Sequence, residues 1–445
     1  MLGDLDRLCR GPAEVDLGNL WAVALIEGTS VEAVQEGYGA PSPHPVWVAA
    51  ALLSRVTEPW RAQDEGWEAE VERRTALAAG VLAQGVGPRA RVARGHATVP
   101  VGWRVPSTVQ ADGEVIQVCR AWPVGERARV AVEGLDGRSR LRAATVDLDG
   151  RVKLLPPGAD DTLPALADVA ARGRLVVHRA GRRAVVELAD RYAKVLRPGR
   201  APGVAEASEA GRRLVEAAGL VAPSVLGHDD SVVDLSVLPG RPVHRLHADP
   251  SWPRIWETWA ASWARLQGLG GEATAGLARH TGGDEAQVLR GWATRAAATG
   301  MLDGTPWPQR LAETARQLGM AAGETTGGLV VTHRDLHDQQ LLWDGTRLGV
   351  LDLDTLCLAE PALDPLNLAV HADLRHAQGL WPAEAVPTVV DAVKGVLTAA
   401  RVGEDRRVLA ERATVTRLAA VYAFRPRWRE RVLAWAERRW AALGG

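Results

Sequence analysis

The chain has 445 residues, which at about 150 residues per domain predicts two or three domains. Its 53 Lys and Arg residues nearly balance 54 Asp and Glu residues. That balance argues against a protein whose main task is to bind nucleic acid or an anionic membrane. A hydrophobic fraction of 47% excludes a disordered chain. No apolar run approaches the roughly 20 residues of a membrane span, and the first residues carry acids instead of the basic charge of a signal peptide, so we expect a cytoplasmic protein.

An internal repeat is the first feature along the chain. Residues 4–20 and 352–368 are related by a constant offset of 348 and are identical at eight of 17 positions. The identities include four polar pairs: Asp4 with Asp352, Asp6 with Asp354, Asp16 with Asp364, and Asn19 with Asn367. We therefore expect residues 1–85 to be a truncated copy of the tail of a larger C-terminal domain, with the missing part encoded upstream or supplied by a homologous partner. The alternative is a chance similarity of two strand–turn–helix units.

Residues 86–165 have a different pattern, with short runs rich in Val and Arg at 114–120, 127–132 and 140–148. Gly, Pro and Asp-Gly pairs punctuate these runs, which is typical of β-hairpins. A short helical segment at 162–172 follows. The sequence therefore predicts a small β-rich module.

From residue 174 the pattern is strand, strand, strand, helix and strand, over 175–178, 183–188, 191–196, 204–218 and 232–238. Residues 252–320 are mostly helical, with Trp252, Ile255, Trp256 and Trp259 on one face. Short strands return at 328–353, and the remainder is helical. These elements predict an α+β fold with a β-rich lobe at 166–242 and a helical lobe at 243–445.

A polar loop at 331–342 precedes an apolar strand at 348–351. It places one carboxylate, Asp335, on the loop and two more, Asp352 and Asp354, at the end of the strand. Carboxylates at the mouth of a buried strand are costly without a cation or hydrogen-bond donors. Oxygen ligands grouped in this way suit Mg²⁺.

These residues resemble the aminoglycoside phosphotransferase family, part of the protein-kinase-like superfamily. The family loop His-Gly-Asp-Leu-His-x-x-Asn matches 333–340 with Arg at the glycine and Gln at the last position. The resemblance covers about 165–445 and implies a bilobal protein-kinase-like fold. It implies that Asp335 accepts or orients the proton of the substrate hydroxyl, and that Asp352 and Gln340 hold Mg²⁺. Asp354 is either a further metal ligand or a hydrogen-bond acceptor, and His333 and Asp364 brace the loop.

The nucleotide side of the resemblance rests on Lys194, one of only three lysines in the chain. It lies on the third predicted strand, where kinases place the lysine that binds phosphate. Its expected partner is Glu209 on the following helix, which we prefer to Glu206. Backbone groups at Ser236–Leu238 occupy the position that meets adenine. The turn at 179–182 has a single glycine, and its arginines either contact phosphate or simply flank a hairpin.

The sequence thus predicts an ATP- and Mg²⁺-dependent phosphotransferase that phosphorylates a hydroxyl group of a small molecule, in the manner of aminoglycoside and choline kinases. The alternative is a catalytically weak or inactive kinase-like scaffold that binds nucleotide, suggested by Gln340 and the glycine-poor turn. We expect no nucleic-acid or membrane partner.

Overall fold

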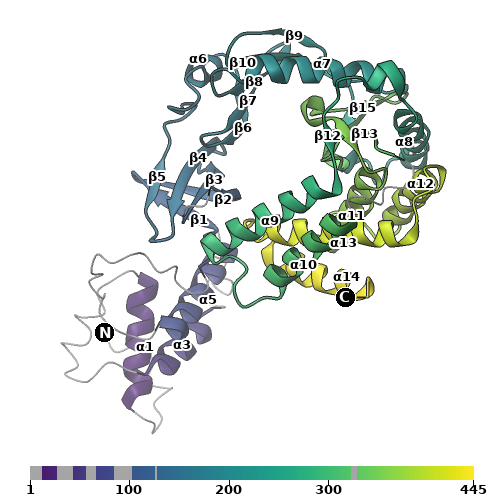
Figure 1. Cartoon of the computed structure of the whole chain (residues 1–445). Helices are drawn as coiled ribbons and strands as arrows, with labels where there is room; N and C mark the ends of the chain where they lie inside the picture. Colours follow the sequence, from purple (N-terminus) through teal and green to yellow (C-terminus); the bar gives the residue numbers. More distant parts are fainter. Residues whose placement is uncertain are drawn as a thin grey trace. The chain divides into compact units, whose positions relative to one another are not determined.

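The computed structural model describes residues 13–27, 44–56, 67–84, 103–125, 128–321 and 328–444 (Figure 1). The chain forms two compact units, Met1–His96 and Ala97–Gly445. The β-rich module and both predicted lobes therefore belong to one compact unit. No helix in the described ranges is long and apolar enough to cross a membrane.

The first unit contains three described helices, α1 (Ala13–Glu27), α3 (Pro45–Ser54) and α5 (Trp67–Gln84). They pack around a small apolar core that includes Trp21, Val48 and Leu52. The repeated positions before residue 13, Asp4 among them, lie outside the described residues.

The two repeat segments resemble each other in a side-chain contact as well as in sequence, because an arginine donates to the equivalent asparagine within each unit. In the first unit Arg55 donates from Nη1 to Oδ1 of Asn19 over 2.9 Å. In the second unit Arg417 donates from Nη2 to Oδ1 of Asn367 over 2.6 Å. Asn19 and Asn367 are one of the pairs related by the offset of 348. The amide of Asn367 also donates to the carbonyl of Leu336 in the polar loop, so in the second unit this contact supports the predicted site.

The β-rich module is a five-stranded antiparallel meander in the order β1-β2-β3-β4-β5. Its strands are β1 (Thr108–Ala111), β2 (Glu114–Pro123), β3 (Arg129–Asp136), β4 (Leu141–Asp147) and β5 (Val152–Leu154). The β1–β2, β3–β4 and β4–β5 hairpins fall at the predicted Asp-Gly pairs, and Gly113 and Gly150 adopt the positive φ that such turns require.

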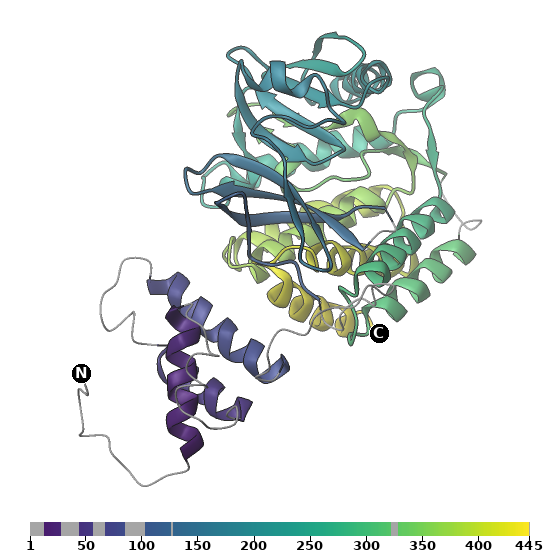
Figure 2. The same ribbon diagram turned by 90° about the vertical axis from the view of Figure 1, so that its left-hand side faces the viewer.

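The meander contacts elements on both sides of it (Figure 2). One face contributes Ile116, Val130 and Val132 to a core shared with C-terminal helices. The backbone amide of Ala121 donates to the carbonyl of Phe424 over 3.1 Å. On the other side the carboxylate of Glu133 accepts a 2.7 Å hydrogen bond from the backbone amide of His178. The meander is thus hydrogen-bonded both to the helical lobe and to the first strand of the N-lobe.

The N-lobe is a second antiparallel sheet in the order β6-β7-β8-β10-β9. Its strands are β6 (Arg174–Arg179), β7 (Arg183–Glu187), β8 (Arg191–Leu196), β9 (Val225–His228) and β10 (Val232–Ser236). The short helix α6 (Leu166–Ala170) precedes the sheet, and α7 (Ala201–Ala217) follows β8. All the predicted N-lobe elements are present. Strand β9 was not predicted, because its four residues are mostly exposed and carry no apolar alternation.

The helical lobe begins after the linker that follows β10. Its main helices are α8 (Trp252–Gln267), α9 (Gly282–Thr299), α10 (Trp307–Met320), α11 (Leu363–Ala377), α12 (Ala385–Ala399), α13 (Glu404–Tyr422) and α14 (Arg429–Ala442). Two small sheets carry the polar loop: β11 (Arg241–Pro242), β14 (Leu341–Trp343) and β15 (Leu348–Val350) form one, and β12 (Arg279–His280), β13 (Val330–Thr332) and β16 (Cys357–Ala359) form the other.

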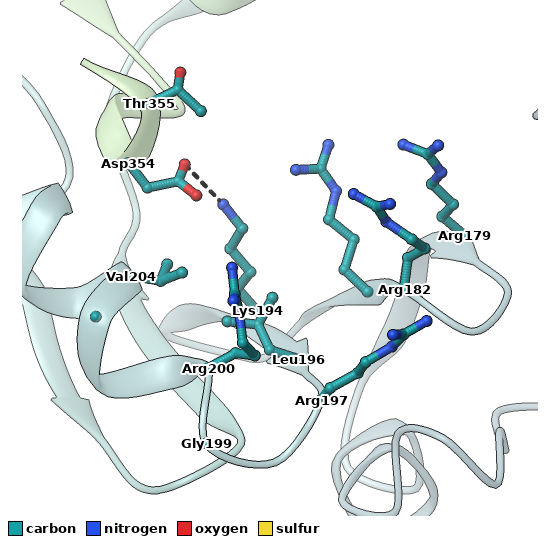
Figure 3. Close-up of a pocket in the computed structure, with 12 residues that line it drawn as sticks. Arg179, Arg182, Lys194, Leu196, Arg197, Gly199, Arg200, Val204, Asp354 and Thr355 are labelled. Carbon is teal, nitrogen blue, oxygen red and sulfur yellow. Dashed lines mark hydrogen bonds and ion pairs between the residues drawn. The ribbon is translucent and has the colours of Figure 1, made fainter. Parts of the chain in front are cut away.

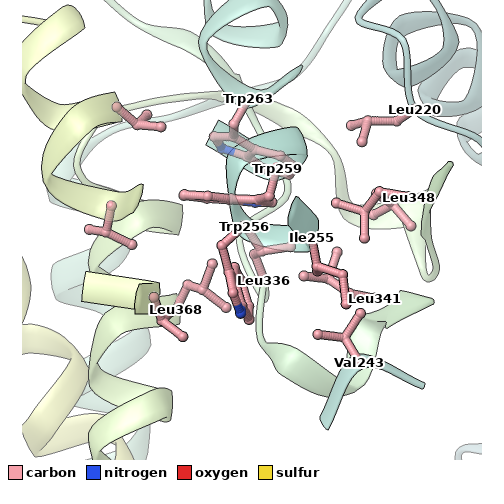
Figure 4. Close-up of a cluster of buried hydrophobic side chains, with 14 of the residues drawn as sticks. Leu220, Val243, Ile255, Trp256, Trp259, Trp263, Leu336, Leu341, Leu348 and Leu368 are labelled. Carbon is pink, nitrogen blue, oxygen red and sulfur yellow. The ribbon is translucent and has the colours of Figure 1, made fainter. Parts of the chain in front are cut away.

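Helix α8 supplies the centre of this lobe's core (Figure 4). As the spacing predicts, Ile255, Trp256 and Trp259 are almost fully buried. The rings of Trp256 and Trp259 meet edge to face with centroids 6.2 Å apart. The same core contains Leu336 of the polar loop and Leu368 of α11. Packing of α8 therefore fixes the loop on which Asp335 lies.

We expect Trp259→Ala to reduce the free energy of unfolding by about 3–5 kcal/mol, because the cavity left by a buried indole is only partly filled. Chemical denaturation monitored by circular dichroism measures this change. Trp259→Phe keeps most of the apolar volume and should cost clearly less. Equal losses for the two variants would contradict the packing role of the indole.

Candidate active site

Asp335 lies on the loop between β13 and β14 with its side chain exposed. Among the described residues no group donates a hydrogen bond to its carboxylate, whereas the flanking residues are fixed. Leu336 is fully buried, and His333 places Nε2 2.7 Å from the carbonyl oxygen of Leu351. The fold thus presents one free carboxylate on a rigid loop, which is the arrangement that a group receiving a proton from a bound hydroxyl requires.

Asp364 braces this loop, as expected. Its carboxylate accepts hydrogen bonds from two consecutive backbone amides, at 2.5 Å from His333 and 2.8 Å from Arg334. Burial raises the pKa of Asp364 to about 6, against the opposing effects of the His333 charge and the two amides. Arg334 adopts φ +76°, in the left-handed region that favours glycine. The arginine at the family's glycine position is therefore tolerated because Asp364 holds the backbone there.

Replacing Asp364 by Ala leaves two buried amides without an acceptor, and each costs about 1–3 kcal/mol. We expect a lower midpoint in urea denaturation and loss of loop-dependent activity. Asp364→Asn retains one acceptor oxygen and should give an intermediate loss. If Asp364→Ala unfolds at the same urea concentration as the parent, the bracing role is wrong.

The expected metal residues Asp352 and Gln340 lie side by side, with Nε2 of Gln340 3.3 Å from Oδ2 of Asp352. Asp352 adopts the left-handed conformation (φ +55°, ψ +50°) at the end of β15, so its side chain turns away from the strand. Mg²⁺ in phosphate-binding sites takes one or two protein oxygens and fills its remaining positions with phosphate and water. The Asp352 carboxylate fits that requirement, and the Gln340 side-chain amide, whose Nε2 donates to Asp352 here, carries an oxygen that could serve as a second protein ligand.

Lys194 lies buried at the centre of the site. Its Nζ is 3.0 Å from Oδ1 of Asp354 and 3.5 Å from Oδ1 of Asp352. Burial opposes ionisation of Asp352, but the charges of Lys194 and Arg183 outweigh it and hold the pKa of this carboxyl below its usual value. Asp352 is therefore ionised at neutral pH, as a metal ligand must be. The structure places Asp354 as the ion-pair partner of Lys194.

The expected pairing of Lys194 with Glu209 is not present. Glu209 accepts hydrogen bonds from the backbone amide of Val225 and from Arg212, on the side of α7 that faces β9. The face of α7 toward the site is marked by Val204, which lines the cavity described below, and by Gly211, where a Cβ would lie 2.8 Å from that of Leu353. Positions 207 and 208 lie between them on that face, and neither is a glutamate. The rotation of α7 about its axis thus explains why Asp354, and not Glu209, is the carboxylate that pairs with Lys194.

Ser236 and Leu238 lie where the chain passes from β10 to the helical lobe. Ser236 Oγ accepts a 2.9 Å hydrogen bond from the backbone amide of Ser224, and Leu238 packs against Gly349 of β15, where a Cβ would lie only 2.5 Å from it. Within the described chain, the backbone amides and carbonyls of Val237 and Leu238 make no hydrogen bond to other backbone groups. They remain available to a planar ligand with donors and acceptors on its edge.

A cavity of about 820 Å³ opens beside Lys194 (Figure 3). Six of its lining side chains are basic and one is acidic: Arg179, Arg182, Arg183, Lys194, Arg197 and Arg200, with Asp354. Sequence reasoning singled out the turn arginines only as an open alternative and missed Arg183, Arg197 and Arg200. In a chain with so many arginines these three carry no signal in the sequence, because only the fold brings them together at the cavity.

A model of the phosphotransferase enzyme family matches residues 162–411. The chain belongs to this family. The match confirms the resemblance inferred from the loop 333–340 and the strand that follows it. No curated protein sequence matches the chain.

Several solved structures of phosphotransferases are similar to the chain. An aminoglycoside phosphotransferase from Streptomyces rimosus is 22% identical, with 57% of this chain and 98% of that chain covered and a TM-score of 0.44. A choline/ethanolamine kinase family protein from Mesorhizobium loti is 18% identical, with 63% and 89% covered and a TM-score of 0.40. A macrolide 2'-phosphotransferase from Brachybacterium faecium is 19% identical, with 60% and 98% covered and a TM-score of 0.34. Because these scores are low, the family assignment rests on the family model.

Proposed function

We propose that this phosphotransferase family member transfers the γ-phosphoryl group of ATP to a hydroxyl group of a small molecule. The observation that carries the proposal is the combination of a free carboxylate, Asp335, on a braced loop with a buried lysine, Lys194, between two carboxylates. These are the parts that phosphoryl transfer needs, because such catalysis consists mainly of positioning and charge neutralisation.

In this proposal each group has a distinct task. Lys194 binds the phosphates of the nucleotide, and the backbone at Val237–Leu238 meets its base. Asp352 and Gln340 hold Mg²⁺, which neutralises charge on the phosphates when it is bound. Asp335 orients the acceptor hydroxyl and takes its proton. Asp354 keeps the Lys194 ammonium directed into the cavity.

The first test is calorimetry with a non-hydrolysable ATP analogue and Mg²⁺. We expect the parent to bind the analogue only when Mg²⁺ is present, and Asp352→Ala to lose this dependence together with at least tenfold in affinity. The control is Asp303→Ala, at a described position outside the cavity lining. A folded parent protein that binds no nucleotide would contradict the proposal.

The alternative from the sequence, a nucleotide-binding scaffold without turnover, predicts binding in calorimetry but no release of ADP. Gln340 is the residue that favours it, because its side chain is one methylene longer than the asparagine of the family loop. Gln340→Asn distinguishes the two functions. The variant should raise ADP release if chain length limits metal binding, whereas a scaffold protein should stay inactive.

A further inference from the structure

The turn between β6 and β7 differs from a phosphate-binding glycine loop in how its backbone is used. The amide of Gly181 donates to Oδ2 of Asp160 over 2.7 Å, and its carbonyl accepts from Arg197. The strand that leads into the turn is anchored through His178, whose amide donates to Glu133. The Gly181 peptide is thus already engaged within the protein, and the turn presents side chains to the cavity.

Those side chains are Arg179 and Arg182. Figure 3 shows their guanidinium groups across the cavity from the ion pair of Lys194 with Asp354. Arg179 is half-buried, and its guanidinium lies over the ring of Trp122, with Cζ 5.1 Å from the ring centroid. Among the described residues neither arginine has a carboxylate within ion-pair distance. The fold therefore holds two cations at one end of the cavity without neutralising them.

The helical lobe adds a third cation, which is not among the residues that line the cavity but is close enough to the arginines of the turn for their charges to interact. Arg295 of α9 is half-buried against the ring of Trp292, with Cζ 4.7 Å from its centroid, and no described carboxylate pairs with it. Burial, together with the charge of Arg182, lowers the pKa of Arg295. Burial and the charges of several arginines, Arg182, Arg183 and Arg295 among them, lower the pKa of Arg179 to about 9. Arg179 remains a cation at neutral pH. A bound anion would offset the free-energy cost of its burial and of its repulsion from the neighbouring arginines.

Acidic residues near the start of α9 do not compensate this charge. Asp284 caps its own helix through Thr281, and Glu285 lies 2.9 Å from Nε2 of the buried His280. An acceptor rich in amino groups would therefore meet like charge at this end of the cavity. Mg²⁺ neutralises much of the charge of a nucleoside triphosphate. The six basic side chains that line the cavity therefore supply more positive charge than the nucleotide requires.

We propose that Arg179, Arg182 and Arg295 form a second oxyanion site beside the nucleotide, and that the hydroxyl acceptor carries a phosphate or carboxylate group which binds there. Guanidinium groups suit both oxyanions, because each can donate two parallel hydrogen bonds. The inference rests on the proposed function, since it names the class of acceptor for the same cleft. It assigns the side chains of the turn a substrate-binding task.

The site is tested with inorganic phosphate as the probe, titrated by calorimetry into protein that is already saturated with the non-hydrolysable ATP analogue and Mg²⁺. We expect phosphate to bind with millimolar or tighter affinity. Arg182→Gln and Arg295→Gln should each weaken phosphate binding at least tenfold and leave the affinity for the analogue unchanged. The matched control is Arg138→Gln, an exposed arginine in the hairpin between β3 and β4, which should change neither.

Two results overturn the proposal while leaving the proposed function intact. One is normal binding of the analogue with no binding of phosphate. The other is loss of affinity for the analogue in both arginine variants, which would assign these residues to the triphosphate. Failure of the parent to bind the analogue at all would instead contradict the proposed function.

A second measurement separates the two oxyanions. Glucose, glucuronate and glucose 6-phosphate are titrated into the same analogue-saturated protein, because they share a hexopyranose ring and differ in the group at C6. Tighter binding of glucose 6-phosphate than glucuronate indicates a phosphate site, and the reverse order indicates a carboxylate site. Tighter binding of glucose than of both charged compounds would overturn the proposal.

Discussion

Asp335→Asn is expected to lower the rate of ADP release by about 10²–10⁴-fold, because the amide can no longer take the proton of the acceptor hydroxyl. The substitution is nearly isosteric, and the carboxylate has no hydrogen-bond donor among the described residues, so folding should be unaffected. Release of ADP is measured first with water as the acceptor and then with an acceptor found by screening. The affinity for the ATP analogue should stay unchanged.

The control for Asp335→Asn is Asp391→Asn, which removes a charge from an exposed aspartate that pairs only with Lys394 on the same helix. It should retain the parent rate. An Asp335→Asn variant that releases ADP at the parent rate would contradict the assignment of Asp335 as the group that takes the proton of the acceptor hydroxyl.

Asp338→Ala should reduce the free energy of unfolding by about 3–5 kcal/mol, because it leaves a buried guanidinium without its counter-charge. Asp338 is completely buried, and its two carboxylate oxygens accept from Arg375 at 2.8 and 3.0 Å. Asp338 lies three residues after Asp335, so its ion pair with Arg375 joins the polar loop to α11. Denaturation in urea gives the change in stability directly.

Two variants make this prediction specific. Glu313→Ala breaks an exposed ion pair with Arg316 on α10 and should leave the free energy of unfolding almost unchanged, because water screens such pairs. The double variant Asp338→Leu with Arg375→Met replaces both buried charges by apolar groups and should recover most of the stability lost in Asp338→Ala. A double variant as unstable as the single one would show that the loss has another cause.

Much of the fold was predictable because its signals are local. The strands of the meander follow from Asp-Gly pairs, and the buried face of α8 follows from the spacing of Trp252, Ile255, Trp256 and Trp259. The polar loop was recognisable because His333, Asp335 and Asp352 keep a fixed order and spacing. Features of this kind can be recognised from the spacing of residues within a short stretch of the chain, without knowledge of contacts between distant segments.

What could not be predicted depends on contacts between distant segments. The partner of Lys194 was assigned to Glu209 from a pattern in one helix, but the rotation of α7 is decided by close packing of Gly211 on Leu353. The arginines of the cavity come from a turn, two strand ends and the start of α7. Arg295 comes from the other lobe. In a chain with balanced net charge, only the fold shows that positive charge accumulates at one place.

The meander limits how far the two lobes can move relative to each other. Two lobes joined by a single linker can open by a hinge rotation about that linker. Here Glu133 ties the meander to β6, and Ala121 ties it to the loop after α13, so a second connection spans the lobes. A wide rotation would break those hydrogen bonds. We therefore expect the two lobes to rotate little relative to each other, so that a ligand must enter and leave the cavity without a wide opening of the lobes.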